Sequence, residues 1–246
     1  MEQSVNIKKE PLGNGFFINV SKNHTFGTDA VLLADFASSK KAKTHCDLGA
    51  GCGIVSMLLL RDNLVEQSVG IEISEEAVSL AKITAEEYAD GRFEPLCADI
   101  KETCGLLPLG SYGLVTCNPP YKANGAGIKS AGTADSAARH ETLCTMEDII
   151  STASRLLCSS GRLCMCQRPE RLTDMMDLMR KYRVEPKRLR IVCKKVGEEP
   201  WLFLLEGRRD AKNGLRIMPP LFIYDENGSY TSEMIKIYGP YKENYL

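Results

Sequence analysis

Short apolar segments alternate with amphipathic ones from residue 44 almost to the end of the chain. The apolar segments are typical of buried strands, and the amphipathic ones are typical of helices that cover a sheet. Such alternation predicts an α/β fold, with a mostly parallel sheet and helices on both faces. The seven predicted strands are 44–48, 68–73, 93–98, 112–117, 162–167, 187–193 and 201–206, and the predicted helices include 54–61, 75–88, 146–157 and 169–182.

Three segments fall outside this alternation. The N-terminal extension, residues 1–43, is predicted to form a strand near 15–20 and an apolar helix with Thr28 as its N-cap, both packed on the core. Residues 44–246 form the main domain, which ends in a hairpin predicted around Asn227-Gly228. Residues 122–142 are rich in Gly, Ala and Ser and predict a long loop, which in a compact domain usually serves function.

The composition excludes several other classes of protein. Of 246 residues, 43% are hydrophobic and 26% are charged, the balance of a globular domain. There is no apolar run of about 20 residues that could span a bilayer. Neither a basic start nor an apolar run marks a signal peptide, so a cytoplasmic protein is expected. No Cys-x-x-Cys pair occurs and the three histidines show no ligand spacing, so we expect no metal site.

Positive charge is concentrated in one segment of the sequence. Residues 151–216 carry 16 Lys and Arg against 8 Asp and Glu, whereas residues 1–150 carry 13 against 20. Such a run is either a solvated face or a surface for a polyanionic partner such as RNA.

A glycine turn follows the first predicted strand. In Asp47-Leu48-Gly49-Ala50-Gly51-Cys52-Gly53, glycines at alternate positions permit a tight turn and the close approach of a ligand. The spacing of Gly49, Gly51 and Gly53 misses the Gly-x-Gly-x-x-Gly of dinucleotide sites. Asp47 would repel a pyrophosphate but pair with an ammonium group. The turn therefore favours S-adenosylmethionine over NAD.

Two further carboxylates lie at the ends of the next two predicted strands. Glu72 is placed to accept hydrogen bonds from ribose hydroxyls, and Asp99 lies at the height of an adenine ring. The carboxyl ends of parallel strands are where ligands bind in open α/β sheets, so these side chains should face the glycine turn.

Asn118-Pro119-Pro120-Tyr121 follows the fourth predicted strand and should face the same crevice. Methylation of an amino group conjugated to a ring requires acceptors that hold its hydrogens and direct its lone pair. The side-chain oxygen of Asn118 and the carbonyl of Pro119 supply two acceptors, and the proline rings restrict their direction. Tyr121 offers a face on which a planar base or amide can stack. We therefore expect a catalytic role for Asn118, Pro119, Pro120 and Tyr121.

With these motifs the chain resembles the class I, Rossmann-like seven-stranded methyltransferases that methylate amino groups. More narrowly, it is similar to the bacterial tRNA(Val) adenine-N6 methyltransferases, which act on the anticodon-loop adenine at position 37. The narrower resemblance rests on Phe26-Gly27-Thr28-Asp29-Ala30-Val31-Leu32-Leu33, on Ala138-Arg139-His140-Glu141 and on Pro219-Pro220-Leu221. It covers nearly the whole chain and implies a tRNA substrate and S-adenosylmethionine as cofactor.

The resemblance also implies which positions bind which ligand. Arg139 would order the long loop or touch RNA, although an ion pair with Glu141 is an equal alternative, and Lys122 joins Tyr121 as a substrate contact. The implied cofactor-binding residues are Thr28, Asp29, Asp47, Gly49, Gly51, Gly53, Glu72, Ile73, Asp99, Ile100 and Asn118.

Three alternatives stay open at the level of sequence. A glutamine-N5 methyltransferase of translation release factors shares the Asn118–Tyr121 motif, but the short segment before Asp47 disfavours the helical N-terminal domain of those enzymes. An rRNA guanine-N2 methyltransferase would also present a planar amine to the motif. A non-catalytic RNA-binding module would have no need of Asn118 and Tyr121.

Overall fold

The computed structural model describes residues 7–119 and 144–239. Four predicted site residues, Pro120, Tyr121, Lys122 and Arg139, lie outside the described residues, as does the whole of the predicted loop at 122–142. Within the described ranges, no helix is both long and apolar enough to cross a membrane.

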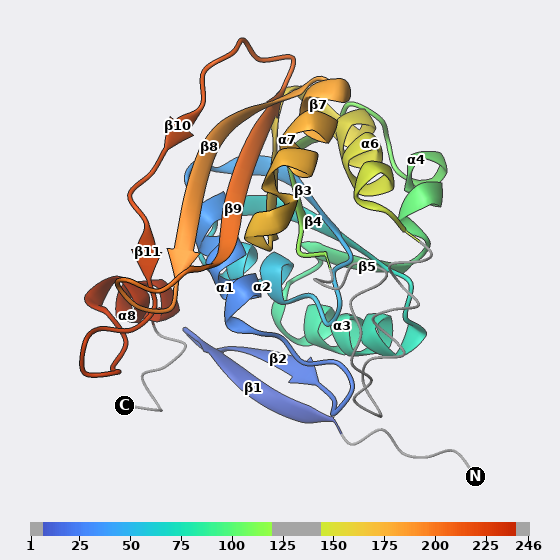
Figure 1. Cartoon of the computed structure of the whole chain (residues 1–246). Coiled ribbons are helices and arrows are strands. Elements are labelled where there is room, and N and C mark those ends of the chain that lie inside the picture. Colours follow the sequence, from blue (N-terminus) through green and yellow to red (C-terminus); the bar gives the residue numbers. More distant parts are fainter. Residues whose placement is uncertain (1–6, 120–143, 240–246) are drawn as a thin grey trace, which may run out of the picture.

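A nine-stranded sheet forms the centre of the molecule, in the order β10-β8-β9-β7-β6-β3-β4-β5, with β11 also paired to β8 (Figure 1). Only β9 is antiparallel to its neighbours, β7 and β8, and the other pairings are parallel. The strands are β3 (Ala42–Leu48), β4 (Val65–Glu72), β5 (Phe93–Cys97), β6 (Tyr112–Cys117), β7 (Leu157–Gln167), β8 (Val184–Cys193), β9 (Pro200–Arg209), β10 (Arg216–Ile217) and β11 (Leu221–Phe222).

The predicted α/β class is confirmed, and each of the seven predicted strands is present, six of them with shifted ends and 112–117 with the predicted bounds. The sheet has nine strands rather than seven because β10 and β11 add to the edge strand β8. Pro219 and Pro220 separate these two short strands. Proline cannot donate a hydrogen bond to its neighbour, so the pairing with β8 is interrupted there.

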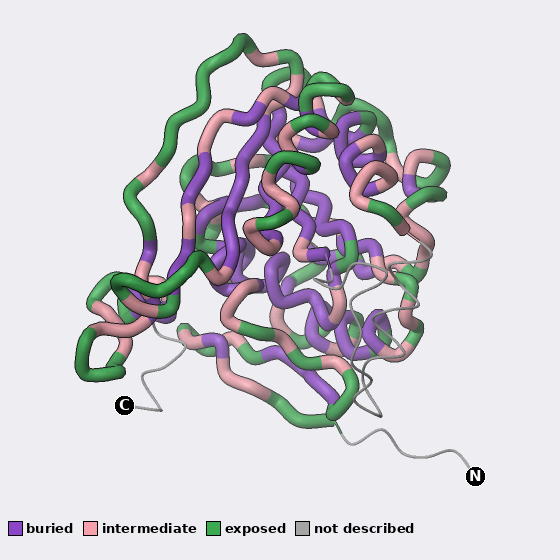
Figure 2. Tube along the Cα trace, viewed as in Figure 1, coloured by how far each residue is buried: buried purple, intermediate pink, exposed green. Residues whose placement is uncertain are grey.

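Helices cover both faces of this sheet (Figure 1). On one face α1, α2 and α3 pack with the β1–β2 sheet, and on the other α6 and α7 pack against β6, β7 and β9. Figure 2 shows the central strands buried along much of their length. The helices are α1 (Thr28–Ala37), α2 (Ile54–Arg61), α3 (Glu75–Tyr88), η1 (Ile100–Glu102), α4 (Thr103–Leu106), α6 (Met146–Leu156), η2 (Pro169–Arg171), α7 (Leu172–Lys181) and α8 (Ser232–Tyr238).

The N-terminal extension holds one strand more than predicted. β1 (Lys8–Gly13) and β2 (Phe16–Val20) form a separate antiparallel sheet, with an irregularity between Pro11 and Gly13. β1 was not predicted because Pro11 argues against a strand, although proline is tolerated at an edge or a bulge. The helix expected from Thr28 is present, yet Gly27 is its N-cap and the Thr28 hydroxyl instead lies 2.8 Å from the Tyr238 hydroxyl.

The predicted C-terminal hairpin is wrong in its second limb. A turn does bring Tyr224 and Tyr230 into an antiparallel bridge, but the residues after Thr231 form the helix α8. The Thr231 side chain accepts a hydrogen bond from the Met234 amide, which caps that helix. Met234 and Tyr238, four residues apart, then face the core on one side of it.

Part of the positive charge of residues 151–216 is turned inward. Glu206 on β9 is fully buried and contacts the guanidinium groups of Arg162, Arg188 and Arg208 at 3.4, 2.8 and 3.3 Å. Arg162 and Arg188 also donate to the carbonyls of Ala37 and Phe36 at the end of α1. The charge run therefore serves in part as an internal anchor, and it is not simply a solvated or RNA-facing surface.

Candidate active site

A pocket lies beyond the carboxyl ends of β3 and β6, between the N-terminal ends of α1 and α2. The strand order reverses there, because the chain moves from β3 to β4 on one side and later returns to β6 on the other. Ligands bind at such a point in open α/β sheets. The pocket is lined by Thr25, Phe26, Gly27, Asp29, Ala30, Asp47, Gly49, Ala50, Gly51, Cys52, Ile54, Val55 and Asn118.

The glycine turn has the backbone that the sequence predicts. Gly49, Gly51 and Gly53 all have positive φ, at 75°, 54° and 90°, which other residues adopt only with strain. A Cβ at Gly49 or Gly51 would meet no described atom within 4 Å, so open space adjoins these two residues. A Cβ at Gly53 would come within 2.7 Å of the Phe93 ring, which makes this third glycine a packing requirement.

Asp47 is buried at the base of the pocket. The Thr116 hydroxyl donates to its Oδ1 at 2.6 Å. The pKa of Asp47 is raised to about 7, mainly because the group is buried; the Thr116 hydrogen bond opposes this rise, and the charge of Glu72 adds to it. The carboxyl group can therefore change its charge near neutral pH.

The carboxylates that end β4 and β5 are both held by backbone amides. Glu72 accepts from the amides of Gly51 and Ser74, each at 2.9 Å, and so connects the glycine turn to the start of α3. Asp99 caps η1 by accepting from the Lys101 amide at 2.9 Å. Ile73 follows Glu72 and is 39% exposed, which leaves an apolar surface beside the strand end. Glu72, Ile73, Asp99 and Ile100 thus lie at adjacent strand ends, although they do not line the pocket itself.

The structure brings Asn118 against Asp29, 89 residues away in the sequence. The Asn118 Nδ2 donates to Asp29 Oδ2 at 3.1 Å, and the Cys166 thiol donates to Asn118 Oδ1 at 2.9 Å. These two contacts set the orientation of the amide, since its NH₂ faces a carboxylate and its oxygen faces a donor. Pro119 follows and is buried, and the rest of the Asn-Pro-Pro-Tyr motif lies outside the described residues.

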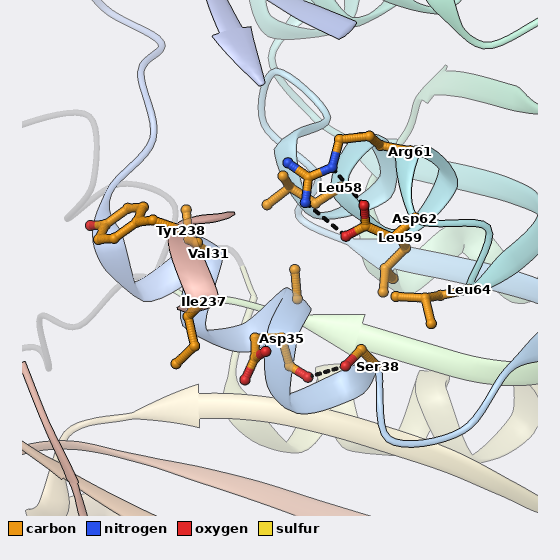
Figure 3. Close-up of a pocket in the computed structure, with 11 residues that line it drawn as sticks. Val31, Asp35, Ser38, Leu58, Leu59, Arg61, Asp62, Leu64, Ile237 and Tyr238 are labelled. Carbon is orange, nitrogen blue, oxygen red and sulfur yellow. Dashed lines mark hydrogen bonds and ion pairs between the residues drawn. The ribbon is translucent and has the colours of Figure 1, made fainter. Parts of the chain in front are cut away.

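A second hollow opens at the other ends of α1 and α2 (Figure 3). Ile237 and Tyr238 of α8 join Val31, Asp35 and several leucines there, and Arg61 pairs with Asp62 at 2.7 Å. Arg61 also donates to the Leu12 carbonyl, so its charge is used to attach β1 to α2. None of the predicted site residues lines this hollow, and we assign it to helix packing.

Sequence reasoning missed the polar residues beneath the pocket. His45, Ser68 and Thr116 are fully buried and hydrogen-bonded to one another on strands read as apolar. A signal was present, because His45 and Asp47 are two residues apart on one strand and must share a face. Cys166, whose thiol donates to Asn118, was likewise not among the predicted site residues. Within residues 7–119 and 144–239 there is no cluster of three or more His, Cys, Asp or Glu arranged to hold a metal.

The sheet order, the glycine turn at the switch point and Asn118 beside it define a class I methyltransferase. The chain belongs to the methyltransferase small domain family, whose model matches residues 21–184. The class predicted from the motifs is thereby confirmed.

Several relatives share one name. The tRNA1(Val) (adenine(37)-N6)-methyltransferase of Porphyromonas gingivalis is 29% identical over 226 residues, which cover 87% of each chain. The protein of the same name from Proteus mirabilis is 30% identical over 168 residues, 65% of this chain and 66% of the other. The enzyme named by these relatives is thus the one that the sequence resembles.

Solved structures support the fold. A predicted O-methyltransferase from Agrobacterium tumefaciens superposes with a TM-score of 0.69 at 22% identity, over 86% of this chain and 95% of the other. A 16S rRNA N2 methyltransferase from T. thermophilus, solved with AdoMet and guanosine, superposes with a TM-score of 0.58 at 16% identity, over 84% and 51%.

Proposed function

We propose that this methyltransferase transfers a methyl group from S-adenosylmethionine to N6 of an adenine in tRNA, namely the anticodon-loop adenine at position 37 of tRNA(Val). The observation that carries the proposal is Asn118, held by Asp29 and Cys166 at the rim of the glycine-turn pocket. The names of the relatives, which align over most of the chain, support this substrate.

The residues of the pocket suit the donor. Gly49 and Gly51 leave room that a Cβ-bearing residue would fill under strain, and the buried Asp47 offers a carboxylate for an ammonium group. Glu72, Ile73, Asp99 and Ile100 lie at the next strand ends, where they would hold the ribose and adenine. Thr28 and Gly53 would support the donor site indirectly. Thr28 contacts Tyr238, and Gly53 packs against Phe93. When bound, S-adenosylmethionine supplies an electrophilic methyl group.

The chain's own residues would position the acceptor amine. A carbonyl oxygen has two lone pairs, so Asn118 Oδ1 can accept from the Cys166 thiol and still accept from an amino hydrogen. The Pro119 carbonyl supplies a second acceptor from a buried residue. Two acceptors hold the lone pair of the amine toward the methyl donor, so catalysis comes chiefly from orientation. Tyr121, Lys122 and Arg139 are proposed to contact the RNA.

A methyl-transfer assay tests the proposal. The full chain is incubated with methyl-labelled S-adenosylmethionine and a tRNA(Val) transcript, and the RNA is digested to nucleosides. We expect label in N6-methyladenosine, and none with a transcript in which adenine 37 is replaced by guanine. Parallel incubations contain rRNA or a release factor in place of the tRNA. Label in N2-methylguanosine of the rRNA, or in glutamine of the release factor, would instead identify one of the two alternative enzymes.

A further inference from the structure

A continuous chain of buried side-chain hydrogen bonds runs beneath the pocket and ends at Asp47. His45 Nδ1 lies 2.8 Å from the Ser68 hydroxyl, which lies 2.9 Å from the Ser56 hydroxyl. His45 Nε2 lies 2.8 Å from the Thr116 hydroxyl, which donates to Asp47 Oδ1. All five residues are at most 2% exposed, and they come from β3, β4, β6 and α2. Together they form a polar row through an otherwise apolar layer.

The charge state of His45 determines how this chain is directed. Burial, together with the smaller effect of the nearby Arg162 charge, lowers the pKa of His45 to about 3, so the imidazole is neutral at pH 7. A neutral imidazole donates from one nitrogen and accepts at the other. The Ser68 hydroxyl donates to Ser56, and the Thr116 hydroxyl donates to Asp47. If His45 Nε2 donates to Thr116, it keeps the single Thr116 proton directed at the Asp47 carboxylate.

We propose that His45 and Thr116 are positioning residues of the methyl-donor site, which hold Asp47 as a carboxylate, with one oxygen engaged and the other left for the ammonium group of the donor. The inference rests on the proposed function, because it assumes that S-adenosylmethionine binds in this pocket. Among the described residues, Thr116 is the only one that donates to the Asp47 side chain. Asp47 lines the pocket, so its second oxygen, Oδ2, is the one proposed to meet the ammonium group.

Charge explains why Asp47 needs this support. Desolvation is the main reason that the pKa of Asp47 is raised to about 7; the Thr116 hydrogen bond opposes the rise, and the charge of Glu72 adds to it. The other carboxylate that lines the pocket, Asp29, supplies no positive charge to offset the rise. Without the Thr116 hydroxyl the pKa of Asp47 would rise further, and the protonated carboxyl would attract an ammonium group weakly. Donor affinity of the wild type should therefore fall as the pH drops through about 7, and loss of the hydroxyl should move that fall to higher pH.

The experiment compares Thr116→Val, which removes the hydroxyl at nearly constant volume, with Thr116→Ser, which retains it. Calorimetric titration measures two probes from pH 5.5 to 8.5. S-adenosylhomocysteine carries the ammonium group, whereas 5′-methylthioadenosine carries the nucleoside without it. Thr84→Val is the matched control, since Thr84 is equally buried but bonds to Asn19, away from the pocket. His45→Leu removes the donor behind Thr116 and serves as a second variant.

Thr116→Val should weaken S-adenosylhomocysteine binding about ten- to hundredfold at pH 7, because it removes a hydrogen bond to a charged group. The midpoint of its pH dependence should move to higher pH, and His45→Leu should move it in the same direction. Thr116→Ser and Thr84→Val should bind as the wild type does, and 5′-methylthioadenosine should bind all variants alike.

Equal weakening of both probes by Thr116→Val, or no difference between the Val and Ser variants, would overturn the positioning role while leaving donor binding intact. If the wild type binds neither probe, the proposed function itself fails, and the inference falls with it.

Discussion

Asn118 shows how much of this site depends on the contacts of one side chain. Its amide is held between the Asp29 carboxylate and the Cys166 thiol, which come from α1 and β7. Neither contact can be read from the Asn-Pro-Pro-Tyr motif, although both decide which way the amide oxygen points. Residue type thus indicates the chemistry, and the neighbours set its direction.

Replacement of this amide should separate catalysis from donor binding. In Asn118→Ala the acceptor for the amine is lost, so methyl transfer should fall at least about a hundredfold, as when one preorganised hydrogen-bonding group is removed from an active site. S-adenosylhomocysteine affinity should change only a few-fold. Single-turnover methyl transfer and calorimetry measure the two effects, with the exposed Asn213→Ala as control. Turnover that survives in Asn118→Ala would contradict the acceptor role.

Substitution of Gly53 tests whether packing against Phe93 requires a glycine at this position. Gly53→Ala places a Cβ 2.7 Å from the Phe93 ring at a φ of 90°, whereas Gly91→Ala meets no described atom at a φ of 71°. The left-handed conformation alone costs about 1–2 kcal/mol. Overpacking adds about 1–3 kcal/mol, so Gly53→Ala should lower the free energy of unfolding by more than Gly91→Ala does. Urea denaturation compares the two, and equal losses would show that Phe93 moves aside.

At the scale of elements, α6 carries the clearest local signal. Its N-terminus is closed by a capping box, in which Thr145 accepts from the Asp148 amide and Asp148 accepts from the Thr145 amide. The box therefore defines the start of the helix.

Loss of the cap should be measurable as a function of pH. Thr145→Ala should lower the free energy of unfolding by about 1 kcal/mol at pH 7. The Thr145 hydrogen bonds hold the pKa of Asp148 below its usual value. Their contribution is therefore complete above the ordinary aspartate pKa and is lost as the pH falls through the folded-state pKa. Denaturation at pH 7 and pH 3 should show the difference from wild type shrinking in acid, while the exposed Thr173→Ala changes stability little at either pH.

At the scale of the whole molecule, contacts from distant parts of the chain converge on α1. Tyr238 of α8 contacts Thr28 at the start of α1, and Arg162 of β7 and Arg188 of β8 donate to carbonyls at its end. α1 carries Asp29, so α8, β7 and β8 together position one wall of the pocket.

Removal of the central charge should be costly. Glu206→Gln leaves Arg162, whose side chain is 4% exposed, without a buried counter-charge. Breaking a buried pair in this way typically costs about 3–5 kcal/mol. Urea denaturation should show such a loss, whereas Glu198→Gln, on the exposed β8–β9 turn, should leave stability unchanged. A loss below about 1 kcal/mol would mean that water reaches the guanidinium groups.

The sequence by itself determined the class of fold, the limits of three core elements and the crevice at which the glycine turn and Asn118 meet. The segments 54–61, 75–88 and 112–117 were predicted with the bounds that the structure has, because apolar periodicity, an N-cap and turn glycines are local signals. The glycine turn and Asn118 were placed at one crevice because parallel strands share a carboxyl edge.

Only the tertiary structure decided what depends on contacts between distant residues. The sequence around 227 signals only a turn. Residues 232–238 form a helix because Thr231 caps it and because Met234 and Tyr238 pack on the core. The basic segment is in part an internal anchor because a buried Glu206 lies opposite it, which no count of charges reveals. Likewise His45 supports Asp47 only through Thr116, 71 residues away, since hydrogen bonds across a sheet depend on strand order rather than on sequence distance.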